Sequence, residues 1–346
     1  MKSPYYIFSP PYRESSAGIK VMYKLCEEII LHGYKAYISN YPSISNELSL
    51  NTNFMAPTLT KKIISYYNLK KISPIIIYPE TFKKSDRLNG FKINYLLNYR
   101  NLNLQKDEFF ISYSRVIFKN LNNSSKKKNL ATLPLLISDK NFFKYKKNNN
   151  RKGVVYYSGK YEENFNFKVP NYFKKFTKIT RDRINSQTKN EIKKIFYNHE
   201  VFLCFEDTAL ALEAMMCGCS VIFIKNKIMK KTILENELSK LRFKYLTLKQ
   251  IKPFLKKKKI VYINKNLILN NLSKIENDNK KELKKLIDRT QFLVKKVKYQ
   301  KFHDLSKVNY FFTSYLIFLI NSLIYFGPIN FLKILFKRLR FFRFKV

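Results

Sequence analysis

Residues 205–222 read FEDTALALEAMMCGCSVI, and they decide the fold. The apolar run 201–205 predicts a strand, 208–217 a helix and 220–224 a second strand. Thr208 or Asp207 can cap the helix, and Gly218 can end it. Because a helix N-terminus carries free N–H groups and a partial positive charge, this segment predicts a diphosphate-binding turn at the end of a strand.

Glu213 lies about one and a half turns into the predicted helix. A carboxylate in this place can accept hydrogen bonds from neighbouring hydroxyls of a sugar. We therefore interpret residues 205–222 as a candidate site for a molecule that carries both a sugar and a diphosphate.

Strand and helix patterns alternate along most of the chain, which predicts an α/β fold with parallel sheets. Residues 5–8, 34–38, 75–78 and 108–113 are candidate strands, with a helix over 21–30. A second alternation has a strand and turn at 153–160, a strand at 176–180 and a helix at 189–196 before the decisive segment. We expect a first Rossmann-like unit over 1–132, a linker over 133–152, a second Rossmann-like unit over 153–300 and a tail over 301–346. Ligands of such folds bind at the carboxyl ends of strands, here in the cleft between the units.

The charge of the chain limits the classes of partner. The 346 residues contain 67 Lys and Arg against 24 Asp and Glu, a formal charge of +43, and 45% are hydrophobic, enough to form more than one core. Phosphate polymers, anionic membranes and phosphorylated small molecules all suit this excess. Because the cations are scattered rather than gathered in one arm or helix, we do not expect nucleic acid as the partner.

Four cysteines without a CxxC and three histidines predict neither a disulfide framework nor a zinc site.

The decisive segment resembles the donor-binding motif of the GT-B nucleotide-sugar glycosyltransferases, in which a Glu-Ala helix ends in Cys-Gly-Cys. Residues 15–21 resemble the Gly-Gly-Ile-Lys-Val turn of that family. Residues 78–80, 95–98, 153–160 and 179–181 resemble segments of its bacterial polysaccharide-assembly members. The resemblance covers residues 5–225 and implies a GT-B fold, with two Rossmann-like domains facing a cleft.

The resemblance also implies roles for individual residues. Glu213 would hold the donor ribose, and Thr208 with the helix amides from Ala209 onward would hold the diphosphate, whose charge Lys160 and Arg181 would neutralise. On the acceptor side the candidates are Gly18, which would allow close approach of a loop, Ser15 as an acceptor contact, Glu14 and Glu80 as bases, and Glu206 as a second catalytic carboxylate.

The sequence departs from the family pattern at two points. Glu206 and Glu213 are separated by six residues where the commonest retaining pattern has seven, and Ser220 replaces the proline after Cys-Gly-Cys. The stereochemical outcome therefore stays open.

The implied activity is transfer of a sugar from a nucleotide diphosphate-sugar to a surface glycan or its lipid-linked precursor, with neither a metal nor a cofactor. Stabilisation of charge on the leaving diphosphate would supply most of the acceleration. The alternatives are a basic nucleic-acid-binding protein or a membrane scaffold without catalysis, and, less favoured, a sugar-nucleotide epimerase of similar fold.

The C-terminal tail carries a run of 25 uncharged residues, 308–332, which is long enough to span a bilayer. Asn321 and Gly327-Pro328 interrupt this run, and Lys and Arg residues follow it between 333 and 343. Such a mixture is typical of a segment that lies on an anionic leaflet. We expect a cytoplasmic protein, peripheral or monotopic on the inner face of the plasma membrane. The alternative is that part of the tail packs back on the protein.

Overall fold

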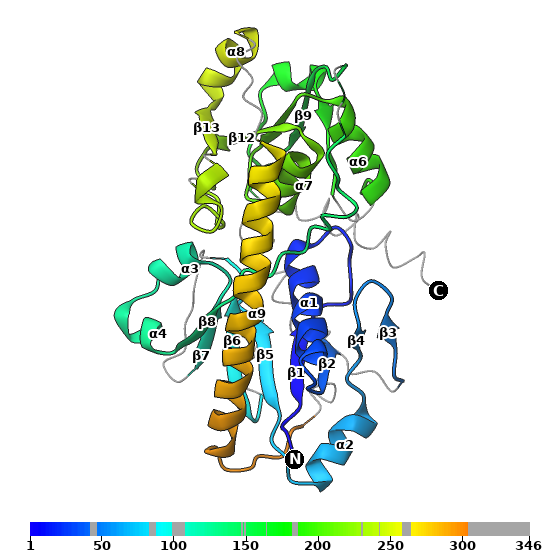
Figure 1. Cartoon of the computed structure of the whole chain (residues 1–346), viewed down its shortest axis with the longest axis vertical. Coiled ribbons are helices and arrows are strands. Elements are labelled where there is room, and N and C mark those ends of the chain that lie inside the picture. Colours follow the sequence, from blue (N-terminus) through cyan, green and yellow to red (C-terminus); the bar gives the residue numbers. More distant parts are fainter. Residues whose placement is uncertain are drawn as a thin grey trace, which may run out of the picture.

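The computed structural model describes residues 1–303 apart from 42–46, 83–87, 99–107, 147, 149, 164, 182–185, 230, 242 and 258–263 (Figure 1). It contains two α/β units, each built on a parallel sheet, and one long helix that runs beside both. Among the described residues, no helix combines the length and the apolar character needed to cross a membrane. The uncharged run 308–332 lies outside these residues.

The first unit is built on a six-stranded parallel sheet. From edge to edge its strands are β2 (Ala36–Asn40), β1 (Tyr5–Ser9), β5 (Ile75–Pro79), β6 (Phe91–Leu96), β7 (Phe109–Ser112) and β8 (Asn129–Thr132). Its helices are α1 (Ala17–Leu31), α2 (Lys61–Leu69), α3 (Arg115–Lys119) and α4 (Asn123–Lys127), and β3 (Leu50–Asn51) pairs with β4 (Ala56–Pro57).

Alternate residues of β1 pack on opposite faces of the first sheet, as the two-residue period of a strand requires. Tyr5 and Ile7 join the core that α1 covers, whereas Tyr6 and Phe8 join a second core that contains Phe302. Both faces are therefore covered, and every residue of β1 is buried.

The second unit is built on a five-stranded parallel sheet. Its strands are, in order, β10 (Thr177–Lys178), β9 (Val154–Tyr157), β11 (Val201–Cys204), β12 (Ser220–Lys225) and β13 (Lys244–Thr247). The helices are α5 (Lys160–Glu163), η2 (Asn171–Lys175), α6 (Lys189–Asn198), α7 (Ala209–Cys217), η3 (Ser239–Leu241) and α8 (Leu248–Lys256).

Helix α9 (Lys265–Lys295) joins the two units. Its first half places Ile268, Leu272 and Ile275 in the core of the second unit, and its second half places Leu286 and Val294 in the core of the first. Figure 1 shows this helix, gold to orange, running along both units. The second half lies within the sequence range 153–300, which was expected to form the second unit, yet it packs on the first.

The expected fold class is confirmed: the chain is α/β, with two Rossmann-like units, each built on a parallel sheet. The expected helical tail lies outside the described residues. Two strands of the first sheet, β6 and β8, were not predicted, because Lys92 and Asn94 interrupt the apolar pattern of β6 and β8 has only four residues.

Candidate functional site

The N-terminus of α7 lies at the carboxyl end of β11, as the decisive segment predicts. Thr208 caps the helix, since its hydroxyl accepts a hydrogen bond from Leu210 N at 3.3 Å. Asp207 does not cap it; its carboxylate accepts hydrogen bonds from Thr232 Oγ1 at 2.9 Å and Ile233 N at 2.6 Å. The turn thus uses one polar side chain to start the helix and the other to hold the loop that follows β12.

The N-terminus of α1 faces that of α7 across the boundary between the units. A small pocket, called here the Glu213 pocket, is lined by Ser15 and Ala17 from the first unit and by Thr208, Ala209 and Glu213 from the second. Each helix leaves N–H groups of its first turn without helical partners, and each brings a partial positive charge. The pocket therefore favours an anionic group.

Glu213 is buried on α7 and accepts a hydrogen bond from Ser138 Oγ at 3.4 Å. Burial raises its pKa, while the positive charges of Lys20, Arg181 and Lys189 act in the opposite direction. A buried carboxylate near three cations can accept hydrogen bonds from a polar ligand without adding net negative charge to the pocket.

Arg181 also connects the two units, because its Nη2 donates to Glu14 O at 2.8 Å. The Glu14 carboxylate accepts hydrogen bonds from the Tyr12 hydroxyl and from Lys20 Nζ, the latter at 3.0 Å. Burial alone would raise the pKa of Glu14, but these two donors lower it. Glu14 is therefore a weak base, which disfavours its expected role in taking a proton.

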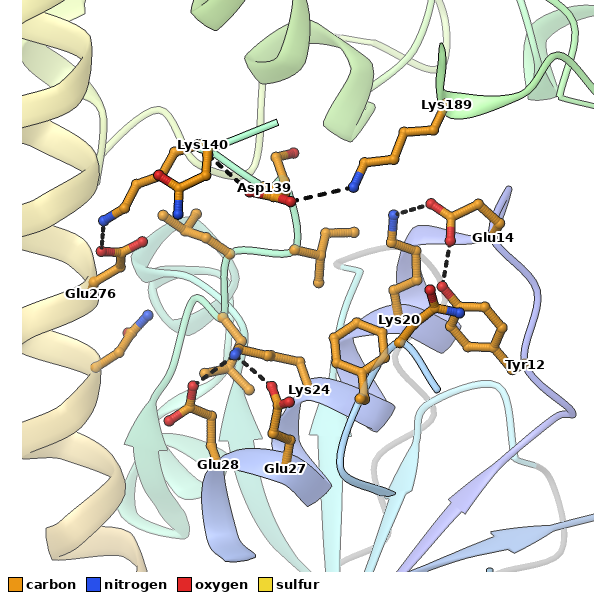
Figure 2. Close-up of a pocket in the computed structure, with 18 of the residues that line it drawn as sticks. Tyr12, Glu14, Lys20, Lys24, Glu27, Glu28, Asp139, Lys140, Lys189 and Glu276 are labelled. Atoms are coloured by element: carbon orange, nitrogen blue, oxygen red, sulfur yellow. Dashed lines mark hydrogen bonds and ion pairs between the residues drawn. The ribbon is translucent and has the colours of Figure 1, made fainter. Parts of the chain in front are cut away.

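A larger cavity of about 650 Å³, called here the ion-pair cavity, adjoins the Glu213 pocket (Figure 2). Most of its charged side chains form ion pairs within its wall: Lys20 with Glu14, Lys24 with Glu27 and Glu28, Lys140 with Glu276, and Lys189 with Asp139. Figure 2 shows the ammonium groups of Lys20 and Lys189 pointing into the same space beside Glu14. The wall suits a polar ligand better than a strongly anionic one.

A third cavity, of about 640 Å³, brings together Glu80, Glu206 and Lys160, and is called here the carboxylate cavity. Glu80 follows β5 of the first unit and accepts from Leu97 N at 2.9 Å; Glu206 follows β11 of the second unit and accepts from Lys160 N at 3.1 Å. Burial raises the pKa of both carboxyls, that of Glu206 to about 7, and the charge of Lys160 opposes the shift in each.

Gly159 makes room for Glu206. Its φ is +37°, and an added Cβ would lie 2.6 Å from Glu206 Oε1 and 2.6 Å from the ring of Tyr157. A residue with a side chain would displace one of these two groups, so the glycine allows Glu206 to keep its place in the carboxylate cavity. Gly18, by contrast, lies in the first turn of α1 and not in a loop, because the helix begins at Ala17. An added Cβ there would meet only Leu97, at 3.5 Å.

The expected site residues thus fall into two neighbouring groups. Glu213, Thr208, Ala209, Arg181, Ser15 and Glu14 line the Glu213 pocket, whereas Glu206, Glu80, Lys160 and Gly18 line the carboxylate cavity. Lys160 was expected beside Arg181 on the diphosphate, but it lies in the other group. Sequence reasoning missed Lys20, Lys189, Ser138 and Tyr157. The two lysines could not be singled out, because single lysines carry no signal in a chain with 67 Lys and Arg.

The raised pKa of Glu206 predicts a pH dependence of stability. The folded protein keeps this proton up to about pH 7, whereas the unfolded chain releases it near the usual value of 4.5, so the free energy of unfolding falls as pH rises between the two. We expect Glu206→Gln to be more stable than the wild type by about 3 kcal/mol at about pH 8 and nearly equal to it at about pH 4. Urea unfolding at both pH values measures this difference, and an equal difference at both would contradict the shifted pKa.

The four cysteines are buried and unpaired. Within the part of the chain that the structure describes, His, Cys, Asp and Glu side chains do not gather in groups of three or more that could hold a metal ion.

No protein-family model and no curated protein sequence matches the chain. Solved structures with a similar arrangement include MurG of Acinetobacter baumannii, at 8% identity and a TM-score of 0.36 over 86% of this chain and 100% of that one. Glycosyltransferase SnogD of Streptomyces nogalater is similar at 8% identity and 0.37, over 85% and 99%. A Listeria monocytogenes protein proposed to be a UDP-N-acetylglucosamine 2-epimerase is similar at 8% and 0.39, over 95% and 98%. At these scores the comparisons assign no activity to this chain.

Proposed function

We propose that this protein is a glycosyltransferase that moves a sugar from a nucleotide diphosphate-sugar to a growing bacterial surface glycan or its lipid-linked precursor. The observation that carries the proposal is the Glu213 pocket. There, two helix N-termini face each other beside a buried carboxylate and the side chains of Lys20 and Arg181. Such a pocket provides positive partial charge for a diphosphate and a hydrogen-bond acceptor for ribose hydroxyls within one helix, as the resemblance of residues 205–222 implies.

In this proposal the diphosphate of the donor lies at the N-terminus of α7, capped by Thr208, and the ribose lies against Glu213. When the acceptor oxygen bonds to the anomeric carbon, the bond from that carbon to the diphosphate oxygen breaks, and its electron pair leaves with the nucleotide. The amides of the two helices and Arg181 stabilise the charge that develops on the leaving phosphates. No metal or cofactor is needed for this stabilisation.

The acceptor would enter the carboxylate cavity, where Glu80 and Glu206 approach from different units. A carboxyl group with a raised pKa is a stronger base once ionised, so either residue can take the proton of the acceptor hydroxyl near neutral pH. The charge of Lys160 beside both carboxyls keeps a fraction of them ionised. We place the proton transfer on Glu80 or Glu206 rather than on Glu14.

A donor panel tests the proposal. The thermal unfolding of the full chain would be measured with UDP-, GDP- and dTDP-sugars, and a donor at about 100 times its dissociation constant should stabilise the protein by about 2.7 kcal/mol. The same donor should release its nucleotide in the presence of a lipid-linked acceptor, also with EDTA present. Absence of both stabilisation and release with every donor would contradict the proposal.

The same panel separates the alternative classes. A nucleic-acid-binding protein would bind RNA or DNA with an affinity that falls steeply with salt, and would release no nucleotide. A sugar-nucleotide epimerase would interconvert two donor sugars without an acceptor. A membrane scaffold would bind no donor.

For location we propose the cytoplasmic face of the plasma membrane, because the uncharged run 308–332 and the basic residues after it suit a peripheral or monotopic attachment.

A further inference from the structure

One end of the first unit gathers three segments that are far apart in the sequence: residues 1–5, 61–71 and 289–303. Figure 1 places the N-terminus, α2 and the last turns of α9 at the end of the molecule opposite α8. Hydrogen bonds hold the segments together: Ser3 N donates to Gln291 Oε1 at 3.0 Å, and Asn68 exchanges hydrogen bonds with the backbone of Phe302 at 2.9 and 3.1 Å. These three segments are called here the basal surface.

The basal surface is cationic beyond the average of the chain. Its three segments carry ten Lys and Arg residues and no Asp or Glu, and all ten side chains are exposed: Lys2, Lys61, Lys62, Lys70, Lys71, Arg289, Lys295, Lys296, Lys298 and Lys301. Two acidic residues adjoin these segments in the sequence: Asp288, which is exposed on α9, and Asp304, which lies outside the described residues. In the ion-pair cavity, carboxylates pair with most of the lysines. The three segments of the basal surface contain no carboxylate that could do the same.

Large apolar side chains stand exposed among these cations. Leu69 of α2 is 84% exposed and Phe292 of α9 is 59% exposed, and Met1, Tyr66 and Val297 are exposed as well. Tyr66 and Leu69 share one face of α2 with Lys62, because these positions are three to four residues apart. Lys296 Nζ lies 4.3 Å from the centre of the Phe292 ring. Exposed lysines together with exposed Leu, Phe and Tyr side chains are the composition of a surface that enters the interface of an anionic bilayer.

The course of the chain supports the same partner. The described residues end at His303, directly after Phe302 is fixed to α2, and the uncharged run begins only five residues later, at Val308. Chain connectivity therefore requires this run to begin within five residues' reach of the basal surface.

We propose that the basal surface docks on an anionic lipid bilayer, with Leu69 and Phe292 entering the interface and the surrounding lysines facing lipid phosphates. This surface acts in addition to the tail, and it does not depend on the transferase activity. The expected orientation directs the second unit away from the membrane, because α8 and the second sheet lie at the other end of the molecule (Figure 1).

Site-specific labelling of the full chain tests the contact. Because all four native cysteines are buried, Leu69→Cys or Phe292→Cys provides an exposed thiol for a fluorophore, and Phe165→Cys provides a matched label on the second unit. Vesicles of phosphatidylcholine and phosphatidylglycerol would carry a nitroxide quencher on the lipid headgroup. We expect quenching at positions 69 and 292 but not at position 165. If the vesicles bind the protein without quenching at 69 and 292, the tail alone makes the attachment and the proposal is wrong. If the protein does not bind these vesicles, the attachment proposed for the tail fails as well.

Charge removal provides the second readout. The triple variant Lys62→Gln, Lys70→Gln and Lys298→Gln should weaken binding to these vesicles by roughly fivefold per lysine, about 100-fold in total. Binding to vesicles of phosphatidylcholine alone should not change. The matched control Lys174→Gln, Lys249→Gln and Lys252→Gln removes three exposed charges from the second unit and should leave binding unchanged. An equal loss in both triple variants would contradict a local surface. A loss of RNA affinity without a loss of lipid binding would assign the surface to nucleic acid instead.

Discussion

Glu213→Gln is expected to lower kcat/KM for the nucleotide-sugar by about 100-fold, because a hydrogen bond to a charged group contributes about 1.5–3 kcal/mol. The amide keeps the shape of the side chain and can still accept the hydrogen bond from Ser138, so the packing of α7 should be preserved. The variant loses the negative charge that faces the nearby cations and, in the proposed function, the ribose hydroxyls. Initial rates of nucleotide release over a range of donor concentrations would measure the effect.

Unfolding experiments control for a structural effect. Because burial raises the pKa of Glu213, ionisation of this group lowers the stability of the folded protein. The neutral variant should therefore be at least as stable as the wild type near pH 8. Glu282→Gln removes a carboxylate from the solvent-facing side of α9 and should leave the rate unchanged. Full activity of Glu213→Gln would show that the donor binds elsewhere, even if the protein proves to be a glycosyltransferase.

Arg151→Ala is expected to lower the free energy of unfolding by about 3 kcal/mol. The buried guanidinium donates to the carbonyl of Phe196 at 2.8 Å, to that of Lys146 at 3.0 Å and to that of Cys217. Two of these carbonyls lie in the last turns of α6 and α7, where a cation also interacts favourably with the helix dipole. Without the side chain, all three carbonyls would lose this donor.

Lys152→Ala is the matched control, since its exposed side chain lies next to Arg151 in the sequence. Urea unfolding of both variants should show a large loss for the first and a change within about 0.5 kcal/mol for the second. Similar values for the two would mean that water satisfies the carbonyls as well as the guanidinium does.

The helix and strands around residues 205–222 are predictable because each signal in this segment is local. The strand pattern, the capping Thr208 and the glycine at the helix end lie in the expected order, and Gly218 indeed takes the left-handed conformation with φ +88°. Strand β6 is not predictable in this way. Asn94 is buried inside it, and its place in the sheet depends on pairing with β5 and β7 on either side.

The grouping of the site residues depends on how the two units are placed, which no local pattern specifies. Glu80 and Glu206 come from different sheets, and Lys160 meets both only because α5 begins beside the end of β11. The sequence alone therefore names most of the candidate residues but cannot divide them between the Glu213 pocket and the carboxylate cavity.

The order in which the two units can be completed during synthesis follows from the position of α9. A ribosome releases the chain from Met1 onward, and domains generally fold as they emerge. The second unit has all its core residues once Ile275 has emerged, whereas the first still lacks Leu286, Val294 and Phe302. The unit that is translated first is thus the last to close. Until then, apolar surface on both faces of its sheet is exposed, and chaperones are the natural means of protecting such surface.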